Sequence, residues 1–121
     1  MTDSLYARLR IVHLLASGLL ALIALTHAGL TWRFYQTWST DAVWFLGTGL
    51  GLLLLALLNL SHIGVEACRQ PTTRLVRAAN WAFALFGLAA ILAVPELQAY
   101  AVALALGTQA VVCRWTLPGP A

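Results

Sequence analysis

The run from Ala42 to Val65 contains no Asp, Glu, Lys or Arg, and it constrains the fold more than any other feature. An α-helix rises about 1.5 Å per residue, so roughly 20 such residues cross a hydrocarbon core about 30 Å thick. Helices of soluble proteins keep one polar face, which this run lacks. It therefore predicts a transmembrane helix.

The composition extends this prediction to the whole chain. Of 121 residues, 61% are hydrophobic and only 9% are charged, whereas soluble domains carry about 25% charged residues. The net charge of +3 comes from seven arginines beside the apolar segments. Such arginines are typical of topology signals and contacts with anionic lipids. No basic stripe suits nucleic acid, which we exclude as a partner.

Three further apolar segments have the length of a membrane span. The first follows Arg8 and Arg10, an order also found in secretory signals, but residues 26–29 make a poor cleavage site. We therefore expect a retained helix there. Ser39 and Asp41 supply capping groups for the second helix, and Pro71 and Pro95 suit the starts of the next two. The expected helices cover residues 5–33, 41–65, 71–94 and 96–115, followed by a short tail at 116–121.

The predicted fold class is an all-α integral membrane protein with four transmembrane helices in a single domain. Short connections favour an up-down antiparallel bundle. A cytoplasmic N-terminus would leave only Arg33 outside. We therefore expect both termini in the cytoplasm, and a bacterial inner membrane as the location. The arginines on the predicted cytoplasmic side are Arg8, Arg10, Arg69, Arg74, Arg77 and Arg114.

Two sequence patterns bear on how the helices associate. Small residues recur at helical spacing, which lets helix backbones approach closely. Separately, Arg10-x-x-His13 is echoed by Arg77-x-x-Asn80, as in folds built from two parallel helix pairs, although chance similarity explains the echo equally well. The expected packing residues are Gly47, Gly51, Ala99, Ala103 and Gly107.

Polar residues near the cytoplasmic ends of the helices form a candidate inner cluster of His13, Asn59, His62 and Asn80. Polar side chains in a span need a partner or a function. The simplest interpretation is hydrogen bonding between neighbouring helices. A sharper alternative is that His13 and His62 ligate a haem iron from opposite sides. No histidine spacing typical of zinc occurs, so we predict no metal site.

A candidate outer pocket comprises His27, Arg33, Tyr35, Asp41 and Glu96. These residues flank the opposite ends of the predicted spans, among several aromatic residues. We expect either a small polar pocket for a headgroup, a quinone or a partner protein, or an ordinary aromatic belt with one interfacial ion pair. The pocket hypothesis predicts that His27→Ala and Asp41→Asn abolish a ligand-induced thermal shift.

The sequence gives catalysis no identifiable basis. It contains no phosphate-binding loop, no nucleophile elbow and no CxxC pair. Ser61 and His62 are neighbours whose side chains we expect to point apart. An ion-coupled exporter is also disfavoured, because no acidic residue lies within the first span. Cys68 and Cys113 are expected to be reduced thiols.

The leading hypothesis is therefore a non-enzymatic inner-membrane protein that acts by helix packing, as an accessory subunit or a self-associating module. Its partners would be the lipid bilayer and other copies or proteins bound through small-residue faces. The alternative is a binding protein for a hydrophobic small molecule or cofactor, such as a quinone, lipid or haem, held between the helices. No specific cofactor follows from the sequence.

Overall fold

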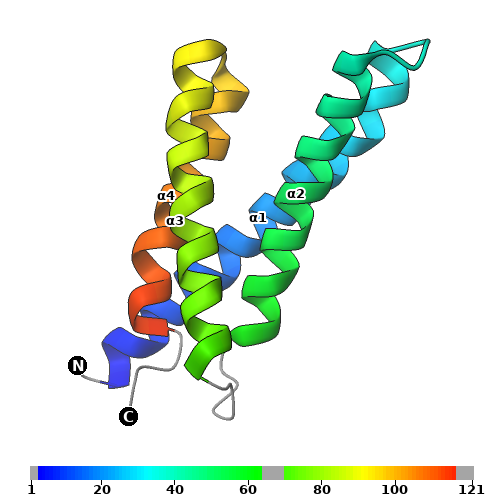
Figure 1. Cartoon of the computed structure of the whole chain (residues 1–121). Helices are drawn as coiled ribbons and strands as arrows, with labels where there is room; N and C mark the ends of the chain where they lie inside the picture. Colours follow the sequence, from blue (N-terminus) through cyan, green and yellow to red (C-terminus); the bar gives the residue numbers. More distant parts are fainter. Residues whose placement is uncertain (1–2, 64–69, 117–121) are drawn as a thin grey trace.

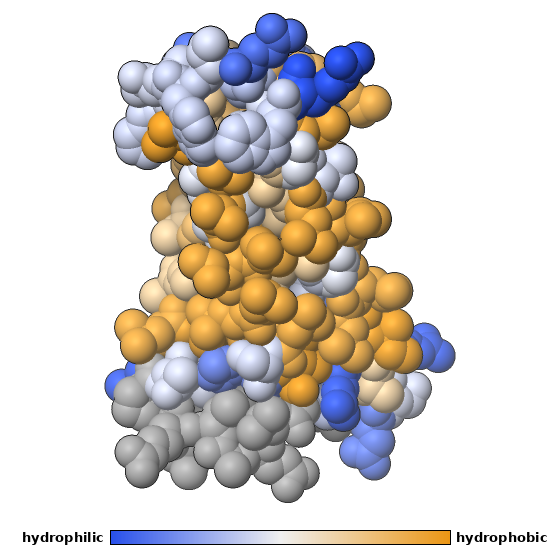
Figure 2. Space-filling model, turned by 90° about the vertical axis from the view of Figure 1, so that its right-hand side faces the viewer, coloured by the Kyte–Doolittle hydropathy of each residue, from blue (hydrophilic) through white to orange (hydrophobic). Residues whose placement is uncertain are grey.

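The computed structural model describes residues 3–63 and 70–116, which form four α-helices (Figure 1). All four are long and apolar enough to cross a membrane, which indicates an integral membrane protein. A band of hydrophobic side chains separates two more hydrophilic ends (Figure 2). The helices are α1 (Asp3–Phe34), α2 (Thr40–His62), α3 (Gln70–Ala93) and α4 (Leu97–Thr116).

Local hydrogen bonds explain where α2 begins and ends. Ser39 is the N-cap, and its hydroxyl accepts a hydrogen bond from the backbone N–H of Ala42 at 3.2 Å. Ile63 adopts extended backbone angles after its N–H bonds the carbonyl of Asn59. The helix thus ends at His62, three residues before the expected end. Residues 64–69, including Cys68 and Arg69, lie outside the described part of the chain.

The helices pack as two pairs that separate toward one end (Figure 1). The first pair is α1 with α2, the second is α3 with α4, and α1 also packs along α4. We call the end that holds the start of α1 and the end of α4 the inner end. The opposite end, where residues 35–39 and 94–96 connect the helices of each pair, is the outer end. The pairs adjoin at the inner end and diverge at the outer end.

Glycines bring the two helices of each pair into close contact. A Cβ on Gly49 of α2 would lie 3.0 Å from the backbone N of Ala28 in α1, and a Cβ on Gly87 of α3 would lie 3.1 Å from the Cα of Ala103 in α4. By contrast, a Cβ on Gly47 or Gly107 would meet nothing within 4 Å. The close contacts therefore lie within each pair.

The hydrophobic core lies where α1, α2 and α4 meet. Leu20, Leu52 and Leu106 are almost fully buried there. Elsewhere, large apolar side chains point outward: Leu92, Leu97 and Leu104 are 87%, 85% and 74% exposed. Such exposure suits a surface that faces lipid rather than water.

Candidate functional site

A buried hydrogen-bond network joins all four helices at the inner end. His13 Nε2 lies 2.9 Å from Asn59 Oδ1, and its Nδ1 lies 2.5 Å from the hydroxyl of Thr116. Asn59 also pairs with Asn80, the two amides exchanging hydrogen bonds of 2.9 and 2.8 Å. These four side chains, which we call the inner polar network, are at most 1% exposed. Three belong to the predicted inner cluster, and Thr116 was not anticipated.

Backbone carbonyls fix the orientation of both amides. The Asn59 side-chain nitrogen donates to the carbonyl of Leu55, and that of Asn80 donates to the carbonyl of Val76. A carbonyl only accepts, so the amide nitrogens must face these groups. Asn59 Oδ1 is then an acceptor, and the ring nitrogen facing it, Nε2 of His13, carries a proton. Asn59 uses both its donors and both its acceptor positions.

This arrangement does not suit haem ligation by His13. Its Nε2 faces Asn59, and its Nδ1 lies against the hydroxyl of Thr116. Both ring nitrogens are therefore engaged, and neither is directed at an open space where iron would bind. Within residues 3–63 and 70–116, no group of three or more His, Cys, Asp or Glu side chains is placed to hold a metal ion.

His62 does not join the inner polar network. Its Nδ1 lies 2.8 Å from the carbonyl of Leu58 and 3.0 Å from the hydroxyl of Ser61. The expectation that Ser61 and His62 point apart was therefore wrong, because both side chains turn back toward the same carbonyl. Since Nδ1 must donate to that carbonyl, it cannot also accept the Ser61 proton. The pair does not form a nucleophile and base in this arrangement.

One further polar contact ties α1 to α4 above the network. The side-chain nitrogen of Gln109 donates to the hydroxyl of Ser17 at 2.8 Å, and both residues are fully buried. Gln109 Oε1 has no hydrogen-bond partner in the described part of the chain. Cys113 is a buried free thiol that donates to the carbonyl of Ala110. The inner half of the molecule is thus closed by polar contacts between helices.

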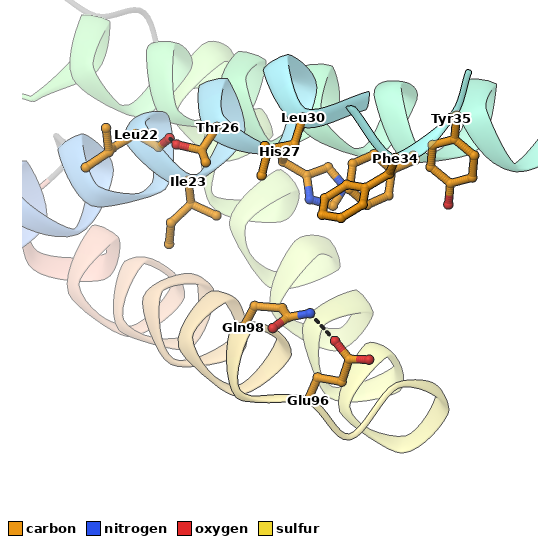
Figure 3. Close-up of a pocket in the computed structure, with 10 residues that line it drawn as sticks. Leu22, Ile23, Thr26, His27, Leu30, Phe34, Tyr35, Glu96 and Gln98 are labelled. Atoms are coloured by element: carbon orange, nitrogen blue, oxygen red, sulfur yellow. Dashed lines mark hydrogen bonds between the residues drawn. The ribbon is translucent and has the colours of Figure 1, made fainter. Parts of the chain in front are cut away.

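At the outer end, the two helix pairs enclose a cleft of about 780 Å³. We call it the outer cleft. One side is formed by α1 and the start of α2, and the other by the connection between α3 and α4 and the first turn of α4 (Figure 3). A cleft of this volume is in the range of small-molecule sites. Its lining residues are Leu22, Ile23, Thr26, His27, Leu30, Phe34, Tyr35, Phe45, Glu96 and Gln98.

The outer cleft gathers only part of the predicted outer pocket. His27, Tyr35 and Glu96 line it, whereas Arg33 and Asp41 do not. Within the described ranges, Arg33 forms no ion pair with either acid. Phe34, the next residue of α1, lines the cleft, whereas Arg33 does not. The predicted interfacial ion pair is therefore absent from this part of the structure.

Phe45 organises the aromatic side of the outer cleft. The His27 ring stacks on it with centroids 3.6 Å apart and planes inclined by 20°. The rings of Tyr35 and Phe34 lie 5.5 and 6.2 Å from Phe45 in tilted and T-shaped arrangements. On the opposite side, the Gln98 amide donates to the carboxylate of Glu96 (Figure 3). The polar contacts of Glu96 thus stay within the second pair.

Glu96 is held in place by the start of α4. Its backbone carbonyl accepts hydrogen bonds from the N–H groups of Ala99 and Tyr100, at 2.9 and 3.3 Å. It is therefore the capping residue of this helix, and the positive end of the helix dipole favours a negative charge at this position. The connection of the second pair thereby presents one carboxylate toward the aromatic side of the cleft.

A smaller groove of about 440 Å³ lies between α2 and α3. It contains one predicted packing pair, since Gly47 and Gly51 line it together with Trp44, Phe83 and Phe86. Gly51 approaches the Phe83 ring at 3.6 Å, measured from a Cβ built on the glycine. The described helices therefore leave this small-residue face only partly covered.

Comparison of the chain with protein-family models, curated proteins and solved structures finds no match. The assignment of a function consequently rests on the geometry of the inner polar network and the outer cleft.

Several residues of these two regions were not predicted from the sequence. Thr116 was overlooked because the expected fourth helix ended at residue 115 and residue 116 was assigned to the tail, whereas α4 extends to Thr116. Phe34 and Phe45 lacked a distinguishing pattern. A usable signal existed for Gln98, because it lies two residues from Glu96 at the start of the same helix.

Proposed function

We propose that the protein binds an amphiphilic small molecule in the outer cleft, with the molecule's polar head toward the outer end and its apolar body between the helix pairs. The observation that carries this proposal is the cleft itself, an opening of about 780 Å³ between pairs that are joined only farther in. Of the two hypotheses raised by the sequence, the geometry favours the binding protein.

The distribution of side chains along the cleft supports this orientation of the ligand. Leu22 and Ile23 line its inner part, whereas His27, Tyr35 and Glu96 lie nearer the outer end. Leu22 and Phe34 are twelve helical residues apart, which corresponds to about 18 Å. That length accommodates an extended chain of ten or more carbons beside the apolar side chains. The polar groups then meet the head at the membrane interface, where aromatic side chains are favoured.

The test is a ligand-binding measurement with a variant that fills the cleft. Ile23→Trp places a large ring in the cleft, and Leu25→Trp places the same ring on an exposed position that does not line it. Molecules that co-purify in mild detergent would be identified by mass spectrometry. We expect a bound amphiphile with the wild type and Leu25→Trp, and its loss with Ile23→Trp. Equal retention by all three proteins would contradict the proposal.

We further propose an up-down antiparallel bundle in a bacterial inner membrane, with both termini in the cytoplasm. The positive-inside rule supports this orientation, because Arg8, Arg10, Arg74 and Arg114 belong to the inner half and Arg33 to the outer end. Single-cysteine labelling with a membrane-impermeant reagent tests it in a background lacking Cys68 and Cys113. Ser39→Cys should react in intact cells, and Arg74→Cys only after permeabilisation. The reverse pattern would contradict the orientation.

A second candidate function is helix association with another subunit, as the leading sequence hypothesis holds. It is favoured by the groove between α2 and α3, where Gly47 has no neighbour within 4 Å of a built Cβ. Small residues promote helix contacts in membranes. Cross-linking in native membranes should give a product that Gly47→Leu removes. An unmodified monomer under the same conditions would count against this role.

A further inference from the structure

The charges around the outer cleft narrow the class of ligand. Among its lining residues in the described chain, Glu96 alone belongs to the Asp, Glu, Lys and Arg set. Arg33, near the outer end of α1, is not part of the lining. A phosphate or carboxylate head would meet the like charge of Glu96 and, among the lining residues, no Arg or Lys, which is unfavourable at an interface of reduced dielectric.

The aromatic rings opposite Glu96 also disfavour an anionic head and favour a positively charged one. Phe34, Tyr35 and Phe45 form a cluster with the stacked ring of His27, and all four rings line the cleft. Figure 3 shows the rings of His27, Phe34 and Tyr35 across the cleft from Glu96. Aromatic faces attract organic cations, and quaternary ammonium groups are recognised by such rings. A carboxylate on one side and aromatic rings on the other therefore complement a positive head attached to an apolar body.

We propose that the outer cleft selects amphiphiles with an ammonium head, and that Glu96 is the counter-ion of this head. This inference rests on the proposed binding function and specifies its ligand class. Glu96 is the capping residue directly before α4, and the Gln98 amide donates to its carboxylate. The ligand body then extends along α1 toward Leu22 and Ile23. A ligand with a neutral head would contact the apolar lining but form no ion pair with Glu96.

The test compares three probes with the same ten-carbon chain: decyltrimethylammonium, decyl glucoside and decyl phosphate. Binding is measured by calorimetry with the full chain in lipid nanodiscs. We expect the wild type to bind the ammonium probe about 5- to 10-fold more tightly than the glucoside, the gain of a partly desolvated ion pair with ring contacts. The phosphate probe should bind most weakly. Glu96→Gln should remove the preference and leave glucoside binding unchanged.

Asp41→Asn is the matched control, since it removes an acid near the outer end that does not line the cleft. It should leave all three affinities unchanged. An equal loss of ammonium binding in Asp41→Asn and Glu96→Gln would overturn the inference, because it would reflect surface charge alone.

Ile23→Trp separates this inference from the proposed function. If it blocks all probes while the wild type shows no preference for ammonium, the ligand class is wrong and the binding function stands. If Ile23→Trp changes no affinity, both the ligand class and the binding function are overturned.

Competition by lysophosphatidylethanolamine distinguishes two sources of the ammonium head. Displacement of the ammonium probe indicates a lipid headgroup, and its absence together with the Glu96→Gln effect indicates a free hydrophobic amine; either result supports the inference.

Discussion

The two ends of this molecule treat polar side chains in opposite ways. At the inner end, all side-chain donors and acceptor positions of Asn59 form hydrogen bonds, with a carbonyl of its own helix and with side chains of α1 and α3. At the outer end, the described contacts of His27 and Glu96 stay within their own helix pairs, and the two residues face a common cleft. A polar residue in a membrane helix thus joins helices where partner side chains lie on the neighbouring helices, and is available to bind a ligand where they do not.

The largest expected effect concerns packing within a pair. Gly49→Leu should lower the free energy of unfolding by about 3 kcal/mol, since even a Cβ would press on the backbone of α1 at 3.0 Å. Gly47→Leu should change it by less than about 1 kcal/mol, because its built Cβ meets nothing within 4 Å. Unfolding in mixed micelles measures both. Equal effects would mean that the first pair is not closed through Gly49.

The next largest effect is expected in the inner polar network. Asn59→Leu should cost about 2 kcal/mol, because it leaves the Nε2 proton of His13 and the amide of Asn80 without their partner. The control is Thr108→Val, which removes a hydroxyl that bonds only the carbonyl of its own helix. The control should be nearly neutral in the same unfolding assay. A neutral Asn59→Leu would show that the inner polar network does not join the helix pairs.

A third prediction concerns ligand binding in the outer cleft. Ile23→Trp should weaken amphiphile binding at least tenfold, equivalent to about 1.4 kcal/mol, while the stability of the ligand-free protein changes little. Binding is followed by the shift in melting temperature that the amphiphile produces. If Ile23→Trp melts like the wild type without ligand and still shows the full ligand-induced shift in melting temperature, the amphiphile does not bind in the outer cleft.

The smallest effect is expected at Gln109. Its nitrogen bonds Ser17, but its oxygen is buried without a partner in the described chain. Gln109→Met removes the favourable hydrogen bond to Ser17 and also the unfavourable burial of the unpartnered oxygen. Because the two effects oppose each other, the unfolding free energy should change by no more than about 0.5 kcal/mol. A loss similar to that of Asn59→Leu would extend the inner polar network to this level of the bundle.

The sequence predicts the four spans well because hydrophobicity accumulates over some 20 residues, and small errors at the ends do not change the count. It also gives depth, so the meeting of His13, Asn59 and Asn80 near one end was foreseeable. Direction around the helix axis is harder to predict. The glycines at 47, 49 and 51 lie on both faces of α2, and the sequence pointed to Gly47 and Gly51 rather than Gly49, which contacts α1.

The outer cleft illustrates the same limit. Depth alone placed Arg33 and Asp41 beside His27 and Glu96, but neither lines the cleft. The expected role of Asp41 in ligand binding is accordingly replaced by its use as a control. The divergence of the two pairs depends on contacts distant in sequence, such as those of Asn59 with Asn80, and hydropathy carries no information about them.

Photo-cross-linking locates the ligand between the diverging helix pairs without relying on a change in affinity. A ten-carbon amphiphile with a diazirine at the end of its chain is activated in nanodiscs, and the labelled residues are identified by mass spectrometry. Binding in the outer cleft predicts labelling concentrated at Leu22 and Ile23 and its loss in Ile23→Trp. Uniform labelling of the exposed leucines Leu25, Leu50 and Leu104, with no excess at Leu22 and Ile23, would contradict it.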